Sequence, residues 1–284
     1  MRKLLTLALL LSPYTASANA DAPSISAWVP TGNGQISASY FGYYSSEVND
    51  FNTGNGSVYM YNLIALNYKI NPRFTASLRP TFTYDTEGVR YGYEMPAKTE
   101  LADSHIALID KNPFSLPYDI KTKGIYKLFA PTAPDQIEAE TYGGVGLDFE
   151  ASRDLPQAFA VSYYTRGWVL AQKNSTYTSN EGKTPKLKAT QNGQIEHWLR
   201  LTKYFGDRLN ISQGVGIKDE FYNATDEEHQ RHEAFQLLET NLNYSVNDNI
   251  DLSFGVAQSN PSFKSFEIYN NDNTSYVIMT SVRM

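Results

Sequence analysis

Charged side chains recur at alternate positions in several stretches of this sequence. Lys121, Lys123 and Lys127 are spaced by two or four residues, and Asp148 and Glu150 by two. In a β-strand alternate side chains point to opposite faces, so each group lies on one face of its segment. Such a face could line a passage for small polar or anionic solutes. Alternatively, the charges could pair with one another and plug the space they face.

We assign a set of such residues to a candidate pore lining. Bases are commoner in the earlier part of the chain and acids from Asp148 onward, which predicts an electric field across the passage. Both readings, an open pore and a lumen filled by paired side chains, remain open because a small barrel can be filled by its own side chains. The assigned residues are Arg79, Lys121, Lys123, Lys127, Asp148, Glu150, Arg166, Glu196, Arg200, Lys218, Glu239 and Asp251.

The positions of the histidines do not predict a hydrolytic active site. His105 follows Ser104 directly, which sends the two side chains to opposite faces of a strand. His197 has Ile195 and Leu199 as same-face neighbours, and neither is a nucleophile. A serine acyl hydrolase needs its nucleophile within hydrogen-bond reach of the base. We therefore assign no catalytic residue.

A second group, Glu227, Glu228, His229 and His232, has spacings that a metal ion could use. No further feature supports a metal or protease site there, so we interpret these residues as solvated loop charge. There is no glycine-rich phosphate loop and no cysteine. The sequence thus predicts neither a cofactor nor a metal.

The N-terminal residues predict export. Arg2 and Lys3 precede the short apolar run 4–11, and the small residues 18–20 offer a cleavage site, as in a secretory signal peptide spanning residues 1–20. Without Arg2 and Lys3 the formal charge changes from -6 to -8, which argues against nucleic acid as a partner. No apolar run of about 18 residues follows, so no transmembrane helix is predicted.

Residues 74–84 (FTASLRPTFTY) show the pattern that must position these charges. Phe74, Leu78 and Phe82 fall on one face, and Thr75 and Arg79 fall on the other. In a soluble sheet the apolar face would be buried, whereas in a membrane barrel it faces lipid and the polar face lines the lumen. The proline at position 80 is discordant, because it cannot donate a ladder hydrogen bond.

Similar segments recur, with short turns alternating with longer loops, as an outer-membrane barrel requires. We expect short turns at 70–73, 152–154, 206–208 and 246–249, and an irregular loop at 85–103. The lipid-facing side of 57–69 and 104–110 is not decided by the pattern. The expected strands are 34–46, 57–69, 74–84, 104–110, 119–130, 139–150, 157–172, 194–205, 209–221, 232–245, 250–258 and 275–284.

The signal peptide, the alternating strands, the short turns and the terminal strand together resemble bacterial outer-membrane β-barrel proteins of the small porin-like or substrate-channel class. The resemblance implies an all-β fold, an antiparallel up-and-down transmembrane barrel of about 12 strands, formed as one domain by residues 21–284. It also implies periplasmic termini and insertion by the barrel-assembly machinery. Members of this class usually end in an aromatic residue, whereas this chain ends in Met284.

Aromatic residues near the expected strand ends predict interfacial girdles, although a soluble core would also use them. These are Tyr40, Tyr84, Phe149, Phe205, Tyr244 and Tyr276. Three functions remain for such a barrel in contact with outer-membrane lipid and lipopolysaccharide. The first is passive diffusion of a small hydrophilic solute. The second is an occluded surface barrel whose loops contact lipopolysaccharide or a partner, and the remote third is an enzyme.

Overall fold

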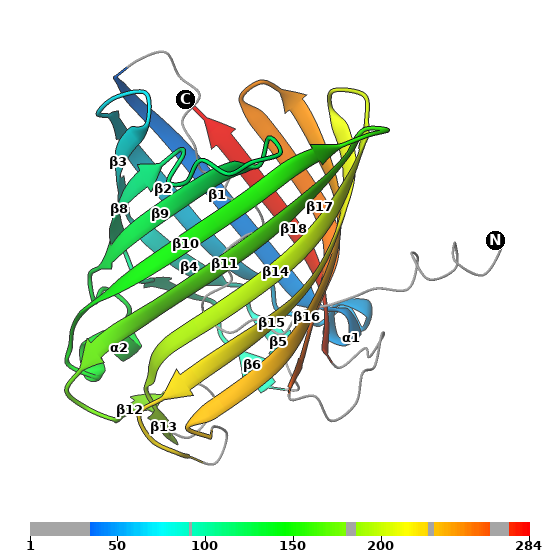
Figure 1. Ribbon diagram of the computed structural model, residues 1–284. Helices are drawn as coiled ribbons and strands as arrows, with labels where there is room; N and C mark the ends of the chain where they lie inside the picture. Colours follow the sequence, from blue (N-terminus) through cyan, green and yellow to red (C-terminus); the bar gives the residue numbers. More distant parts are fainter. Residues whose placement is uncertain (1–34, 91–92, 180–185, 227–229, 262–272) are drawn as a thin grey trace.

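The protein forms a closed antiparallel barrel of 12 strands (Figure 1). This computed structural model describes residues 35–90, 93–179, 186–226, 230–261 and 273–284. Strand β1 (Ile36–Glu47) pairs with both β2 (Tyr59–Lys69) and β18 (Thr274–Arg283), which closes the sheet on itself. The predicted all-β, up-and-down barrel is therefore confirmed. The predicted signal peptide lies outside the described residues.

Two strands of the wall are interrupted and carry two labels each, namely β3 with β4 and β7 with β8. The wall continues β3 (Phe74–Arg79), β4 (Thr81–Asp85), β7 (Lys98–Leu101), β8 (His105–Asp110), β9 (Lys121–Phe129), β10 (Thr141–Leu155), β11 (Phe159–Gln172), β14 (Gln191–Phe205), β15 (Leu209–Tyr222), β16 (His232–Asn247) and β17 (Ile250–Pro261). The longer connections contain α1 (Val48–Asn52), β5 (Gly88–Arg90), β6 (Tyr93–Met95), α2 (Pro134–Glu138), β12 (Thr176–Ser179) and β13 (Lys186–Ala189).

Pro80 interrupts the wall without breaking the barrel. Its carbonyl still accepts a hydrogen bond from the Ile64 N–H at 3.1 Å. On the other side the register shifts by one residue, because Arg79 pairs with His105 while Phe82 pairs with Leu101. The extra residue forms a bulge at 102–104, in keeping with the use of prolines beside irregularities.

Two sequence-based boundaries are wrong. The loop expected at 85–103 contains β7, which pairs with β4 and belongs to the wall. The turn expected at 152–154 lies instead at 156–158, because β10 runs on to Leu155. Gln157 and Ala158 take positive φ angles of 61° and 59°, which suits a tight hairpin but is uncommon for these residue types.

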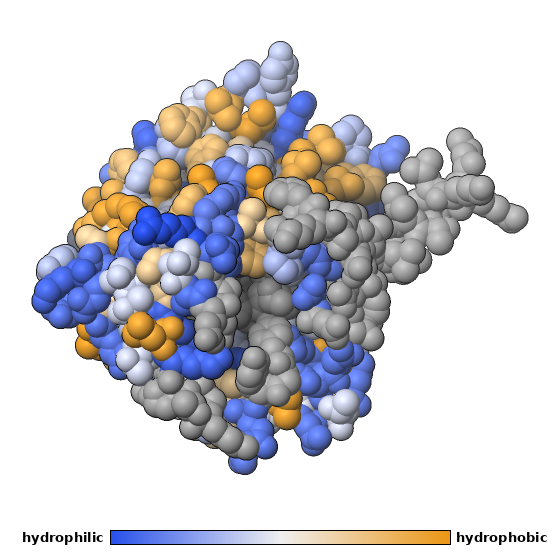
Figure 2. All heavy atoms as spheres, turned by 90° about the horizontal axis from the view of Figure 1, so that it is seen from below, coloured by the Kyte–Doolittle hydropathy of each residue, from blue (hydrophilic) through white to orange (hydrophobic). Residues whose placement is uncertain are grey.

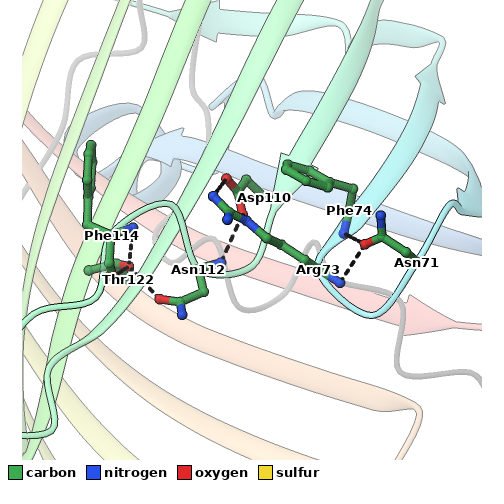
Figure 3. A network of polar contacts seen from close by, with 7 residues as sticks. All are labelled: Asn71, Arg73, Phe74, Asp110, Asn112, Phe114 and Thr122. Carbon is green, nitrogen blue, oxygen red and sulfur yellow. Dashed lines mark hydrogen bonds and ion pairs between the residues drawn. The ribbon is translucent and has the colours of Figure 1, made fainter.

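The short turns gather at one end of the barrel and the long connections at the other (Figure 1). At the short-turn end, Asn71 Oδ1 accepts hydrogen bonds from the Arg73 and Phe74 N–H groups, both at 2.8 Å (Figure 3). The Arg73 guanidinium donates two bonds of 2.7 Å to the Asp110 carboxylate. This bidentate pair fixes the 70–73 turn to the end of β8.

The two faces of the wall have the inverted polarity expected of a membrane barrel. Leu78 is 51% exposed on the outside, whereas Arg79, the next residue, is 1% exposed on the inside. Viewed from the loop end, hydrophobic residues are commonest along the upper and left-hand edges of the molecule, and hydrophilic residues cover much of the nearer surface (Figure 2). Within the described residues, no helix combines the length and apolarity needed to cross a membrane.

Candidate functional site

Ion pairs between side chains of the inward face form a layer along the inner surface of the wall, from β9 to β16. The pairs are Lys127–Asp148 at 2.7 Å, Arg166–Glu196 at 2.6 Å, Lys218–Glu220 at 2.7 Å and Arg200–Glu239 at 3.7 Å. All eight side chains are almost completely buried. Most of them belong to the assigned lining. Two of the pairs join inward residues of adjacent strands, and Lys218 and Glu220 are same-face neighbours within β15. Arg200 reaches Glu239 past Gly214 of the strand between them.

Trp198 lies at the centre of this layer and is fully buried. Its indole Nε1 donates a hydrogen bond to Glu196 Oε1, and the Arg200 Cζ lies 4.9 Å from its ring. The ring rests on β15 at Gly214 and Gly216, where an added Cβ would come within 3.1 Å and 2.8 Å of indole atoms. Glycines at these inward positions give the indole its space.

The opposite side of the lumen is apolar, which the sequence pattern did not reveal. Phe41, Tyr43, Tyr61, Leu63 and Met279 form a buried cluster with their neighbours on β1, β2, β17 and β18. This cluster explains why both faces of 57–69 read as apolar. Leu63 and its inward neighbours face the cluster, while alternate residues such as Leu66 are exposed outside. In 104–110 the inward side likewise carries His105 and Ile109.

A cavity of about 440 Å³ lies inside the barrel toward the short-turn end. Its walls combine the polar and the apolar side of the lumen, because Arg200 and Asn241 line it together with Phe41 and Met279. Many of the other lining side chains are hydroxyls and amides. This volume is in the range of small-molecule sites.

The remaining assigned residues lie nearer the rims or beside other strands. Lys121 and Asp251 line the cavity at the short-turn end, paired with Asp154 at 2.7 Å and with Arg283. Glu150 also lines the cavity, and Lys123 is half-buried on the inward face of β9.

Arg79 belongs to the other half of the wall, where its Nε donates to Ser77 Oγ at 3.1 Å. The assigned residues therefore share the inward face but do not form one cluster.

Solved structures with the same architecture are outer-membrane proteins. An outer membrane channel from Pseudomonas putida F1 superimposes with a TM-score of 0.58 at 9% identity, covering 95% of this chain and 100% of that one. The β domain of the Bordetella autotransporter BrkA gives 0.50 at 11% identity, covering 88% and 100%. This chain has the outer-membrane β-barrel fold. No protein-family profile matches the sequence, and a search of curated proteins finds no relative.

The predicted girdle residues lie toward the two ends of the barrel, apart from Tyr40. Phe205 and Tyr244 are exposed near the short turns, where Phe149 packs edge-on against Phe114 at 5.6 Å between ring centroids. Tyr84 and Tyr276 are exposed near the loops.

Tyr40 differs from these residues. Its hydroxyl donates to Asn62 Oδ1 at 2.6 Å and lies 2.9 Å from the Tyr44 hydroxyl, on the outer face. This side chain is therefore engaged in a local polar cluster, while the girdle role of the set as a whole stays a prediction.

The described histidines lie apart from one another. The His105 ring packs against Phe129, His197 Nδ1 lies 2.8 Å from the Tyr163 hydroxyl, and His232 Nε2 lies 2.7 Å from Asp219 Oδ1. Among the described residues, no group of three or more acidic or histidine side chains could hold a metal ion. Residues 227–229, which include the rest of the candidate metal group, lie outside the described residues.

Proposed function

We propose that this protein is an outer-membrane channel for the passive diffusion of small hydrophilic solutes, with both termini in the periplasm. The observation that carries the proposal is the inverted wall, whose inward face holds buried charged residues and a cavity of about 440 Å³. Lipid would cover the exposed apolar belt, and lipopolysaccharide and the barrel-assembly machinery would be its partners in the membrane.

A second function, that of an occluded surface barrel, is favoured by the ion-pair layer. Arg166 and Glu196 are each about 3% exposed, so water does not reach them in this arrangement. In that case the loops would carry the function by contacting lipopolysaccharide or a partner. An enzymatic role has no supporting arrangement of side chains among the described residues, and we do not propose one.

Conductance of the purified protein in a planar lipid bilayer separates the two functions. We expect discrete current steps, and we expect Arg166→Gln to change their size or ion selectivity because the charge faces the lumen. Glu140→Gln, in an exposed pair at the loop end, is the control and should leave the current unchanged. Absence of current at every salt concentration would support the occluded barrel instead.

A further inference from the structure

The cavity near the short-turn end is lined by an arginine, Arg200, that does not use all of its hydrogen-bond donors within the described part of the chain. Arg200 is 6% exposed and lines the cavity. Its ion pair with Glu239 is long, at 3.7 Å, and its Nε has no hydrogen-bond partner among the described residues. Guanidinium carries five donors, and a buried donor without a partner costs free energy that a suitable acceptor would recover.

The other cations of the cavity differ from Arg200 in this respect. Lys121 Nζ lies 2.7 Å from Asp154 Oδ2, in a pair whose side chains are both 71% exposed. Arg283 is paired with Asp251. These two cations are therefore already matched by carboxylates at the rim. Arg200 is the deeper cation, and its carboxylate partner is held at a greater distance.

Two further buried side chains of the cavity wall, on β16 and β17, have unused hydrogen-bonding atoms. Asn241 is 1% exposed, and its Nδ2 donates to Glu239 while its Oδ1 has no partner among the described residues. Ser253 lines the same cavity, and its Oγ is likewise unbonded among the described residues. The site thus offers a charged donor at Arg200, an acceptor at Asn241 and a hydroxyl at Ser253.

An apolar surface borders the polar part of the cavity wall. Phe41 and Met279 are buried members of the apolar cluster and line the cavity on β1 and β18, where Met279 pairs with Ser253 of β17. A solute that fits both sides must combine an apolar body with an anionic group and a hydroxyl. A neutral sugar would offer the Arg200 guanidinium only uncharged acceptors, which form weaker hydrogen bonds than a carboxylate, and an inorganic anion would leave the apolar surface uncovered.

We propose that this cavity is a binding site for a small organic acid that carries a hydroxyl group. The carboxylate accepts hydrogen bonds from the Arg200 guanidinium, the hydroxyl donates to Asn241 Oδ1, and the apolar body packs against Phe41 and Met279. The inference rests on the proposed channel function for its biological meaning, because the bound acid would be the transported solute. Binding itself can be measured without transport.

Calorimetric titration of the folded barrel in detergent tests the site with 4-hydroxybenzoate as the probe. We expect it to bind about tenfold or more tightly than 4-hydroxybenzyl alcohol, which lacks the carboxylate. Arg200→Gln should remove this difference. Asn241→Ala should remove the preference of the wild-type protein for 4-hydroxybenzoate over benzoate. Lys203→Gln, which removes a cation on the outer face of β14, is the matched control and should leave both preferences intact.

Several results would overturn the site. These are no binding of 4-hydroxybenzoate, tighter binding of glucose, or an undiminished preference in Arg200→Gln. Should Arg200→Gln fail to fold, as judged by its mobility in unheated gels, Arg200→Lys and Asn241→Ala still decide the matter. The lysine variant should weaken binding because it loses the planar fork. Binding without conductance would leave the site standing and contradict the channel, and conductance without binding would do the reverse.

Discussion

Arg166 of β11 and Glu196 of β14 are directly paired across two adjacent strands, with 2.6 Å between Nη2 and Oε2. Glu196 also accepts hydrogen bonds from Gln194 Nε2 and Trp198 Nε1. A carboxylate can be buried when its charge is paired and it accepts several hydrogen bonds, and Glu196 accepts three. Around Arg166 and Glu196 the inward face of the wall is therefore polar, yet solvent hardly reaches it.

Breaking this pair on one side should destabilise the barrel. Glu196→Gln leaves the Arg166 charge buried without its carboxylate, which we expect to cost about 3–5 kcal/mol in the free energy of unfolding. Urea unfolding in lipid vesicles, followed by tryptophan fluorescence, measures the loss. Asp154→Asn in the exposed pair with Lys121 is the control, and we expect no measurable change because solvent screens that pair. An equal loss in both variants would contradict the explanation.

The glycines under Trp198 should be sensitive to any added side chain. A Cβ on Gly216 would lie 2.6 Å from the His197 carbonyl oxygen, so the strands or the indole would have to move. We expect Gly216→Ala to cost about 1–3 kcal/mol of stability and to change the near-UV circular dichroism of the tryptophan. At Gly167 the nearest atom would be 3.5 Å away, so Gly167→Ala should be tolerated. A tolerated Gly216→Ala would show that the indole is not held against the strand.

A charged residue introduced on the outer face should destabilise the barrel. Leu199 lies midway along β14 and is 53% exposed on the outside. If lipid covers it, Leu199→Arg should destabilise the folded barrel in vesicles by about 2–4 kcal/mol. Thr202→Arg adds the same side chain on the inward face at the cavity and should cost less. Equal costs for the two variants would argue against lipid contact at Leu199.

At acid pH, protonation of Glu140 should weaken its ion pair with Lys173 and make the backbone at the loop end easier to open. Lys173 Nζ donates to Glu140 Oε2 at 2.5 Å, and this bond holds the pKa of the Glu140 carboxyl below its usual value. Because the folded pKa is lowered, the contribution is present at neutral pH and is lost as the pH falls through that pKa. The Asn174 N–H, bonded to the Ala139 oxygen at 3.0 Å, should then lose protection, so its exchange rate should move closer to the intrinsic rate at that pH.

Glu140→Gln provides the comparison for this acid effect. In that variant, hydrogen exchange at Asn174 should show no step with pH beyond the intrinsic dependence. A step of the same size in the variant would assign the effect to another group, such as Asp135, whose carboxyl pKa is raised by burial.

The alternating polarity of individual strands could be predicted from the sequence where one face is strongly charged. In β14, Glu196 and Arg200 are inward while Leu199 and Leu201 are exposed, as the period of two requires. The pattern failed on β2, because one side of the lumen is apolar and both faces of that strand then look alike. For the same reason, the sequence pattern did not predict the apolar surface of the cavity formed by Phe41 and Met279.

The errors in the connections have local causes. The β7 segment of the wall is short and ends at a bulge, so residues 98–101 carry too little alternation to be recognised as a strand. The turn after β10 uses Gln157 and Ala158 at positive φ, where Gly or Asn would have marked it. Which inward charges meet also depends on register, and register is set by the pairing of whole strands.

Spin labels at two adjacent residues of β14 test the orientation of the wall most directly. The chain has no cysteine, so Leu201→Cys and Thr202→Cys each give a single labelling site. In lipid vesicles we expect the label at 201 to collide mainly with oxygen dissolved in the bilayer, and the label at 202 to collide mainly with a water-soluble nickel chelate. The reverse result, or equal accessibility at both positions, would contradict an outward apolar face in contact with lipid.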